Sequence, residues 1–233
     1  RVQMESAIQS FSVDTVYHVA AYKQVPMVEK NIVEGVQNNI FGTLISAQVA
    51  EKYEVRNFVL ISTDKAVRPT NFMGATKRFA EQVLQSIAQG ECATRFSIVR
   101  FGNVLGSSGS VVPLFQDQIS RGGPVTVTDP NVRRFFMTIR EAVQLVLKAG
   151  SAARGGEVFV LDMGKPVPIL QLARQVIESA GYTVRDEDHP EGDIEIKIIG
   201  LRPGEKIEEE LTLSGDLIGT CYQKIFCARE ESL

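Results

Sequence analysis

Short apolar runs alternate with longer segments of helical periodicity over the first hundred residues of the chain. Three runs have the β-branched, apolar pattern of strands that are buried on both faces of a sheet: residues 13–19, 58–61 and 96–101. The segments between them predict helices at residues 33–53 and 71–89, the first with Val36, Ile40 and Leu44 at helical spacing. Since strand and helix alternate, we expect an α/β fold with a doubly wound parallel, Rossmann-like sheet.

Beyond Asn103, glycines interrupt this rhythm and the predicted elements become shorter. Helix or strand patterns return at residues 138–149, 157–161, 168–180 and 193–199. We therefore predict two interleaved domains: residues 1–103 and 138–162 form the Rossmann-like domain, and residues 104–137 and 163–233 form a smaller α/β lobe. In such sheets ligands bind beyond the carboxyl ends of the strands, so a ligand is expected there, between the domain and the lobe.

The start of the chain lacks a feature that doubly wound dinucleotide domains have. Such a domain opens with a strand, a glycine-rich turn and a helix whose N-terminus binds the pyrophosphate. Residues 1–10 instead have the pattern of a single helix, and no glycine-rich turn precedes Val13. We therefore expect the chain to be an N-terminally truncated piece that lacks its first βαβ unit.

Charge and composition exclude several classes of function. The net charge of −3 gives no electrostatic basis for binding nucleic acid. Three widely spaced cysteines do not predict a disulfide framework, and two distant histidines do not predict a zinc site, so no metal is expected. No stretch reaches the roughly 18 apolar residues that a membrane-spanning helix needs.

The most informative segment for chemistry follows the second predicted strand. It reads Ile61-Ser62-Thr63-Asp64-Lys65, and a second motif, Met73-Gly74-Ala75-Thr76-Lys77, lies near the start of the next predicted helix. The carboxyl end of a strand is where this type of sheet carries its chemistry, and residues four apart, such as Met73 and Lys77, share a helix face. Alone, however, an Asp-Lys pair is more often a solvated turn, and a helical lysine is more often a surface residue.

Together with motifs elsewhere in the chain, these two segments become specific. In sequence order the further motifs are His18-Val19-Ala20-Ala21-Tyr22-Lys23-Gln24-Val25-Pro26, Asn38-Asn39-Ile40-Phe41-Gly42-Thr43, Arg100-Phe101-Gly102-Asn103-Val104-Leu105-Gly106 and Leu201-Arg202-Pro203-Gly204-Glu205-Lys206. Over about residues 13–213 the series resembles the extended short-chain dehydrogenase/reductase superfamily. More narrowly, it resembles the UDP-N-acetylglucosamine 4,6-dehydratases of bacterial polysaccharide and protein-glycan synthesis.

The resemblance implies an enzyme that converts UDP-N-acetylglucosamine to a UDP-4-keto-6-deoxy sugar with NAD or NADP. Such an enzyme oxidises C4 of the sugar, removes the C5 proton and the C6 hydroxyl, and returns the hydride to C6, so the cofactor is regenerated. The reaction needs an acid at C6, a base at C5 and a group that takes the proton of the C4 hydroxyl. The residues that the resemblance implies for cofactor binding are Ala20, Ala21, Ser62, Lys77 and Phe101.

By the same resemblance, Thr63, Asp64 and Lys65 lie against the sugar, with Asp64 as the acid at C6 and Lys65 as the base at C5. A lysine is a base only when neutral, so burial or a positive neighbour such as Lys77 must lower its pKa. Because successive side chains of a strand point to opposite faces, Asp64 and Lys65 can reach one substrate only if the chain leaves the strand conformation at about Thr63.

Met73 departs from the superfamily pattern. The usual catalytic pair is the tyrosine and lysine of Tyr-x-x-x-Lys, and this chain has Met73 where the tyrosine belongs, four residues before Lys77. A thioether cannot take a proton from a hydroxyl, but the surrounding motif resembles a branch of the 4,6-dehydratases that has methionine at this position. In that branch Thr63, Asp64 or a bound water must take the proton of the C4 hydroxyl, and the sequence does not distinguish them.

Five residues are predicted to hold the nucleotide sugar: Lys23, Asn103, Arg134, Arg202 and Glu205. Arg202 is expected to bind the diphosphate, since a guanidinium matches phosphate oxygens as a fork, and Arg134 is a second phosphate candidate. Asn103 is expected to donate to phosphate or sugar, Glu205 to accept from ribose hydroxyls, and Lys23 to reach the sugar. Each of them can also be read as an ordinary surface-turn residue.

Two other functions stay open on the sequence alone. A nucleotide-sugar 4-epimerase or reductase shares the fold, although those enzymes typically keep the tyrosine and lack the pair formed by Asp64 and Lys65. A chain without the cofactor loop and the tyrosine fits a non-catalytic binding relative as well. The resemblance further implies a homo-oligomer. Because the family often carries transmembrane helices before this domain, it also implies a cytoplasmic domain whose parent protein is anchored in the inner membrane.

Overall fold

The computed structural model describes residues 1–229, and the chain divides into two compact units. Unit 1 comprises Arg1–Phe101, Val143–Asp162 and the described residues from Glu210 onward. Unit 2 comprises Gly102–Ala142 and Met163–Glu209. The chain thus leaves unit 1 twice and returns to it twice.

Unit 1 is built on a six-stranded sheet with the order β1-β2-β3-β8-β13-β12. Four neighbouring strands are parallel: β1 (Thr15–His18), β2 (Asn57–Ile61), β3 (Arg95–Arg100) and β8 (Val158–Leu161). Two antiparallel strands extend the sheet, β13 (Ile225–Ala228) and β12 (Leu217–Gly219). Every residue of β8 is buried, as expected for a parallel strand that is covered on both faces.

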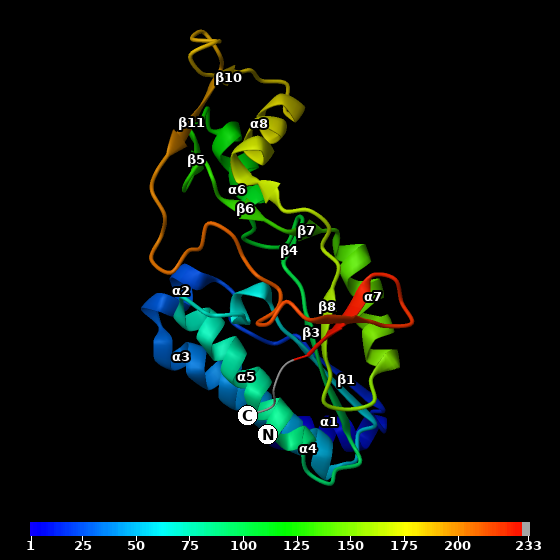
Figure 1. Cartoon of the computed structure of the whole chain (residues 1–233). Coiled ribbons are helices and arrows are strands. Elements are labelled where there is room, and N and C mark those ends of the chain that lie inside the picture. Colours follow the sequence, from blue (N-terminus) through cyan, green and yellow to red (C-terminus); the bar gives the residue numbers. More distant parts are fainter. Residues whose placement is uncertain (230–233) are drawn as a thin grey trace. The chain divides into compact units, whose positions relative to one another are not determined.

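Helices cover both faces of this sheet (Figure 1). On one face α1 (Val2–Phe11), α4 (Gly42–Lys52) and α5 (Phe72–Ala88) share a core with β2, β3 and β8. α2 (Val25–Lys30) and α3 (Ile32–Val36) pack against α5. On the other face, α7 (Ile139–Ala152) approaches the sheet so closely that Gly150 lies against Val59 and Tyr17.

Unit 2 has its own core, between two helices and a small sheet. The sheet is parallel, with the order β10-β11-β5, formed by β10 (Val184–Arg185), β11 (Ile194–Ile198) and β5 (Val125–Val127). α6 (Val111–Ser120) and α8 (Ile169–Ser179) supply Phe115, Ile119, Ala173 and Ile177 to the core. Two short ladders complete the unit, β4 (Asn103–Val104) with β7 (Phe136–Met137) and β6 (Arg133–Arg134) with β9 (Val167–Pro168).

The predicted α/β fold with a mostly parallel Rossmann-like sheet is confirmed, and each helix and strand predicted for the first hundred residues is present. The helix predicted at residues 33–53 consists of α3, a π-helical segment η1 (Gln37–Phe41) and α4 in direct succession. The prediction omits α2 and α6. α2 is only six residues long and contains Pro26, and the glycine-rich run before α6 obscures its apolar spacing.

The two compact units differ from the predicted domains in two places. The chain from Glu210 onward belongs to unit 1 and not to the smaller lobe, because β13 pairs with β8 and so joins the large sheet. Residues 138–142 and the turn at Gly102 and Asn103 belong to unit 2, because Asn103 and Val104 pair with β7 there.

Candidate functional site

The end of β2 determines where the chemically interesting side chains of unit 1 lie. The backbone N–H groups of Ser62 and Asp64 still donate to carbonyls of Val99 and Phe101, at 2.8 and 3.1 Å, so the chain follows β3 for two residues beyond the strand. It then turns into a 3-10 helix, η2 (Asp64–Ala66). The expected departure from strand conformation at about Thr63 is therefore confirmed.

Asp64 is fully buried and holds both of its sequence neighbours. Its Oδ1 accepts a hydrogen bond from the Thr63 hydroxyl at 2.8 Å and one from Lys65 Nζ at 3.0 Å. Its Oδ2 is buried and has no hydrogen-bond partner among the described residues. Because a buried carboxylate oxygen is costly to leave unpaired, this atom is suited to a bound donor or to carrying a proton itself.

Lys77 lies on α5, and only 6% of it is exposed. Its Nζ donates to the Ile61 carbonyl at 2.7 Å, at the end of β2. Burial lowers the pKa of Lys77 to about 8, although the nearby negative charge of Glu81 opposes the shift. Lys77 therefore releases its proton at a pH much closer to neutral than an ordinary lysine does.

Glu81 joins three elements around this lysine. Its carboxylate accepts from Arg100 Nε and Nη2, at 2.7 and 2.6 Å, and neither side chain is exposed. It also accepts from the Ser62 hydroxyl at 2.5 Å and from Arg78 at 3.1 Å. Sequence analysis missed Glu81 and Arg100. The signal was an arginine that closes a largely apolar, buried strand, together with a glutamate one helical turn after Lys77.

The segment that follows β1 is fastened to the same helix by an amide side chain. Asn39, in η1, accepts from the Tyr22 N–H at 2.7 Å and donates to the Tyr22 carbonyl at 3.1 Å. It also donates to the Thr76 hydroxyl of α5 at 2.9 Å. Ala20 and Lys23, beside Tyr22, are exposed, and Ala21 is half-buried.

α5 begins directly against η2, and two residues explain why. Asn71 caps the helix, since its side chain accepts from the Gly74 N–H at 2.7 Å. A Cβ on Gly74 would lie 2.2 Å from the carbonyl oxygen of Lys65, so only glycine permits this approach. Met73, which stands at the position of the usual catalytic tyrosine, is 3% exposed.

Unit 2 collects a second group of predicted residues around the loop at residues 202–207. The Arg134 Nη1 donates to the carbonyls of Arg133 and Ile207, and its Nη2 donates to the Lys206 carbonyl and the Glu205 carboxylate. Four of its five N–H groups thus hold the protein itself. Arg134 organises the loop in this structure, and its role as a phosphate ligand stays a prediction.

Glu205 is the carboxylate at the centre of that loop. Besides Arg134, at 3.2 Å, it accepts from the Thr128 hydroxyl at 3.0 Å and from the Arg202 N–H at 3.1 Å. Arg202 itself is exposed, and Asn103 is half-buried at the start of β4. These contacts give the predicted nucleotide-binding residues of unit 2 a defined arrangement.

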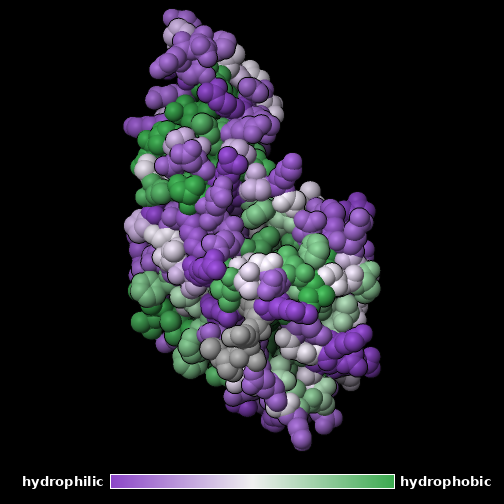
Figure 2. Space-filling view, viewed as in Figure 1, coloured by the Kyte–Doolittle hydropathy of each residue, from purple (hydrophilic) through white to green (hydrophobic). Residues whose placement is uncertain are grey.

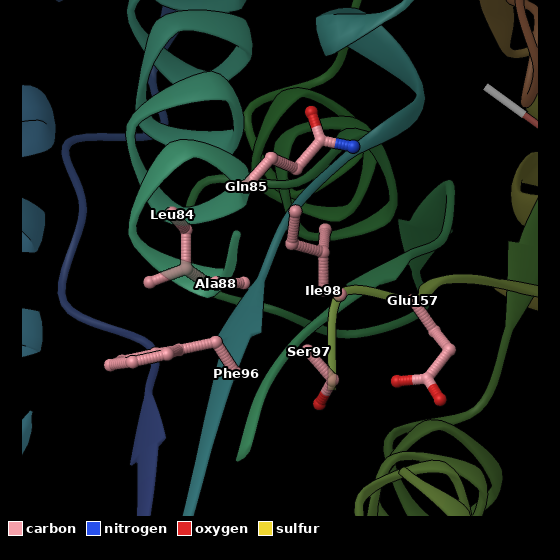
Figure 3. A pocket seen from close by; sticks show the side chains of 8 residues that line it. Leu84, Gln85, Ala88, Phe96, Ser97, Ile98 and Glu157 are labelled. Carbon is pink, nitrogen blue, oxygen red and sulfur yellow. The ribbon is translucent and has the colours of Figure 1, made fainter. Parts of the chain in front are cut away.

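Two cavities of unit 1 lie at the amino ends of the parallel strands, where β3 and β8 begin. Figure 3 shows the smaller one, with an empty volume of about 130 Å³, between the end of α5 and the residues Phe96, Ser97 and Glu157. The larger, with an empty volume of about 810 Å³, shares Gln85 and Glu157 with it. Neither is lined by a predicted site residue, and ligands of such sheets bind at the carboxyl ends.

Within residues 1–229, no group of three or more His, Cys, Asp or Glu side chains is arranged to hold a metal ion. None of the helices described here is both long enough and apolar enough to cross a membrane. Cys92, Cys221 and Cys227 are free thiols.

The sequence profile of the family described as "Polysaccharide biosynthesis protein" matches residues 1–230. The capsular polysaccharide biosynthesis protein CapD of Staphylococcus aureus is 52% identical over 97% of this chain and 37% of its own length. A UDP-glucose 4-epimerase of Rickettsia canadensis is 37% identical, and a UDP-N-acetylglucosamine 4,6-dehydratase (inverting) of Campylobacter jejuni is 35% identical. The match to each of the last two covers 88% of this chain and 58% of theirs.

Solved structures share the fold. Pen from Bacillus thuringiensis has a TM-score of 0.86 and 38% identity, with 97% of this chain and 68% of that chain covered. DesIV, a dTDP-glucose 4,6-dehydratase from Streptomyces venezuelae solved with NAD, has a TM-score of 0.78 and covers 90% of this chain and 67% of its own. At 18% identity, that likeness establishes the fold alone. The chain spans between about a third and three fifths of the curated relatives named above.

Proposed function

This chain belongs to the polysaccharide biosynthesis protein family, and we propose that the protein containing it is a nucleotide-sugar 4,6-dehydratase that converts UDP-N-acetylglucosamine to a UDP-4-keto-6-deoxy-N-acetylhexosamine. The observation that carries the proposal is the buried Asp64 carboxylate, with Thr63 and Lys65 on one oxygen and no described partner on the other. Because the chain spans only part of its curated relatives, the activity is proposed for the whole protein.

Asp64 is assigned the role of the acid that protonates the departing C6 hydroxyl. Its Oδ2 can hold that proton, or accept a substrate hydroxyl, without breaking any bond described in unit 1. The substrate reaches it beside Thr63 and Lys65, which are half-buried. A positioned acid of this kind contributes about 10²–10⁴ in rate.

Lys65 is assigned the role of the base that takes the C5 proton. Its Nζ lies 3.0 Å from Asp64 Oδ1. Lys65 keeps the proton that it takes from C5 for return to C5, and the proton that leaves Asp64 with water is replaced by the one released from the C4 hydroxyl. The Lys65 side chain is 19% exposed, which lets its protons exchange with solvent before C5 is protonated again. The two residues therefore act as one acid–base pair.

The predicted cofactor residues fit a nicotinamide dinucleotide. Ala20 and Ala21 follow β1, Ser62 follows β2 and Phe101 follows β3, so all four lie at the carboxyl ends of adjacent parallel strands, where such sheets bind nucleotides. The small side chains of Ala20 and Ala21 leave space for a close approach. NAD or NADP, when bound, supplies the hydride chemistry between C4 and C6 of the sugar.

Met73 leaves the proton of the C4 hydroxyl to another group. Its thioether is buried and has no exchangeable proton. Thr63, Asp64 or a water molecule takes that proton, and the hydrogen bond between Thr63 and Asp64 connects the first two. Lys77 supplies a positive charge next to Ile61, at the end of the same strand.

The nucleotide part of the substrate is assigned to residues of unit 2, with Lys23 from unit 1. The exposed guanidinium of Arg202 binds the diphosphate, and Asn103 donates to phosphate or sugar. Glu205 accepts from the ribose hydroxyls. Arg134 holds the loop in which Arg202 lies through its Nη1 and Nη2 groups, and it is the second candidate ligand of the phosphate.

A nucleotide-sugar 4-epimerase is the second candidate, because a relative with that name is 37% identical to this chain. The pair formed by Asp64 and Lys65 and the methionine at position 73 favour the dehydratase, since an epimerase needs no acid and base for the loss of water. A non-catalytic binding relative is the third.

Incubation of the full-length protein with UDP-N-acetylglucosamine and NAD, followed by NMR of the product, separates the three. The dehydratase yields a 4-keto-6-deoxy sugar nucleotide without accumulation of NADH. An epimerase yields an isomer that keeps its C6 hydroxyl. Unchanged substrate with a folded, cofactor-loaded protein contradicts both enzymatic functions.

The protein is further proposed to form a homo-oligomer through the outer surface of α2, α3, η1 and α5. Large apolar side chains are exposed there: Met27, Val33, Phe41, Phe72 and Phe79, each at least 48% exposed. Figure 2 shows hydrophobic surface over this side of unit 1, at the left of the view. Exposed apolar patches of this kind mark contact surfaces. Sedimentation of wild type and Phe79→Glu tests the proposal, and a monomeric wild type contradicts it.

A further inference from the structure

Glu81 connects the residue that follows β2 with the last residue of β3, although it belongs to none of the sequence motifs. It accepts the Ser62 hydroxyl, directly after β2, and the Arg100 guanidinium, at the end of β3. On α5 it lies one turn after Lys77, whose Nζ donates to Ile61, the residue before Ser62. α5 is thus fastened to consecutive residues of the β2 end by two side chains, one positive and one negative.

The hydrogen bonds define what each group presents to its surroundings. Because Arg100 donates to both oxygens of Glu81, the carboxylate is ion-paired and acts as an acceptor only. The Ser62 hydroxyl must then donate its proton to Glu81, and its remaining lone pairs can only accept. Glu81 thereby fixes the orientation of a residue that is assigned to the cofactor.

We propose that Glu81 is a positioning residue that holds Ser62 and the end of β2 against α5 and supplies the negative charge that keeps a proton on Lys77. The inference rests on the proposed function only for its catalytic consequence. The protonation of Lys77 is measurable in this chain without substrate or cofactor.

Charged and titratable groups lie on α5 itself and on several neighbouring elements. α5 itself contributes Glu81 and Arg78, and β3 contributes Arg100. η2 contributes the ion pair of Asp64 and Lys65, and β1 contributes His18, which is coupled electrostatically to Lys77. Glu29 of α2 accepts the N–H of Phe72 at the start of α5; Lys30 of α2 and Glu34 of α3 complete the set. Of these, Glu81 is the negative group that opposes deprotonation of Lys77.

His18 does not replace Glu81 in this role. Burial and the charge of Lys77 lower the pKa of His18 to about 4, so the imidazole is neutral at the pH at which Lys77 titrates. Its Nε2 lies 3.2 Å from the Thr43 hydroxyl, and its ring stacks on Phe58. His18 therefore acts as a neutral packed side chain in this range of pH.

The test is a pH titration of Lys77 by NMR in this chain, with ¹³C at the lysine Cε atoms and the signal assigned through Lys77→Arg. In Glu81→Gln the midpoint is expected to move down by about one pH unit, because a negative charge next to a buried ammonium is lost. Leu84→Ala, one turn further along α5 and also fully buried, is the matched control. It loosens the core without altering charge, and its midpoint is expected to stay at the wild-type value.

Glu81→Gln leaves Arg100 without its partner and risks unfolding, so Glu81→Gln/Arg100→Gln is titrated as well. This double variant contains no unpaired buried charge at the two positions, and its Lys77 midpoint is also expected below the wild-type value. A Lys77 midpoint that is unchanged or higher in the folded variants overturns the inference, as does an equal shift in Leu84→Ala.

Activity of the full-length protein separates this inference from the proposed function. If the protein is a dehydratase, the alkaline limb of its kcat/KM profile moves down in Glu81→Gln by the same interval as the Lys77 midpoint, and stays in Leu84→Ala. A shifted Lys77 midpoint in a protein that leaves UDP-N-acetylglucosamine unchanged supports the positioning role and contradicts the dehydratase.

Discussion

Around Lys77, charged side chains are buried and bond mainly to one another, whereas around Glu205 they lie nearer to solvent and bond largely to the backbone. The side chains of Glu81 and Arg100 have no exposed surface. Arg134 and Glu205 expose 9% and 21% of theirs, and three of the Arg134 hydrogen bonds end on carbonyl groups. In each region, however, one carboxylate collects several donors.

The difference follows from what each region is proposed to do. Burying a charge is costly unless it is paired and fully hydrogen-bonded, so a buried network has few alternative arrangements. Groups that transfer protons must keep their positions to within about half an ångström, which the region of Lys77 and Asp64 achieves through such pairing. A loop that binds a nucleotide can rely on exposed donors such as Arg202 and on a backbone held by Arg134.

The largest effects are expected from the proton-transfer groups of unit 1. In the full-length protein, Asp64→Asn and Lys65→Ala should each lower kcat by about 10²–10⁴. Arg202→Ala, in the exposed loop of unit 2, should raise KM and leave kcat nearly unchanged, because it removes binding that substrate and transition state share. Steady-state kinetics on folded variants measures both. If both Asp64→Asn and Lys65→Ala turned over substrate at the wild-type rate, the proposed proton transfer in unit 1 would be contradicted.

Stability should separate the two arginines. Arg100→Met leaves Glu81 buried without its main partner and should lower the free energy of unfolding by about 3–5 kcal/mol. Arg134→Met removes hydrogen bonds from a partly solvated loop and should cost only about 1–3 kcal/mol. Urea unfolding of this chain measures both values, with Glu81→Leu/Arg100→Met as the control that restores most of the loss. An equal loss of unfolding free energy in Arg100→Met and Arg134→Met contradicts the proposed difference between the two regions.

The pH dependence of stability should contain a contribution from Lys77. Its pKa is about 8 in the folded chain against the ordinary value of 10.5, so between these values the unfolded state binds more protons. The contribution of Lys77 to stability therefore rises with pH across this window, by about 3 kcal/mol in total. Comparison of wild type with Lys77→Met by urea unfolding at pH 8 and pH 10 isolates this contribution. The expectation is contradicted if the free energy of unfolding changes with pH by the same amount in wild type and in Lys77→Met.

The smallest effect on chemistry is expected at Met73. Met73→Ala should keep kcat of the full-length protein to within about tenfold, since methionine has no proton to transfer. It should lower the stability of unit 1 by about 2–5 kcal/mol, because the side chain is buried. Activity is therefore compared only after circular dichroism has confirmed folding. A folded variant that loses a hundredfold or more would make Met73 part of the chemistry.

Sequence patterns predict the part of the fold that is governed by periodicity. Apolar runs and helical spacing are enough for β1, β2, β3 and α5, because parallel strands between helices are apolar throughout. They are not enough for β13, whose pairing with β8 joins residues far apart in the chain, or for β12, which pairs with β13. Nor do they reveal the π-helical segment that turns Asn39 toward Tyr22 and Thr76.

Sequence motifs likewise select only some residues of the candidate site, whose roles stay predictions. Ser62, Asp64 and Lys65 could be selected because they follow a strand and match a motif. Glu81 and Arg100 gave only a weak signal, since their importance comes from a contact between a helix and a strand that spacing alone does not specify. The hydrogen bonds that Arg134 donates to the neighbouring loop are likewise visible only in the three-dimensional structure.

Turnover of UDP-N-acetylglucosamine by the full-length protein in deuterated water tests the central claim most directly. If Lys65 removes the C5 proton and returns one that has exchanged with solvent, NMR of the 4-keto-6-deoxy product finds deuterium at C5, and Lys65→Ala forms little of this product. Full conversion to that product with ordinary hydrogen at C5 would contradict proton abstraction by this pair. An isomer with its C6 hydroxyl intact would contradict the dehydratase itself.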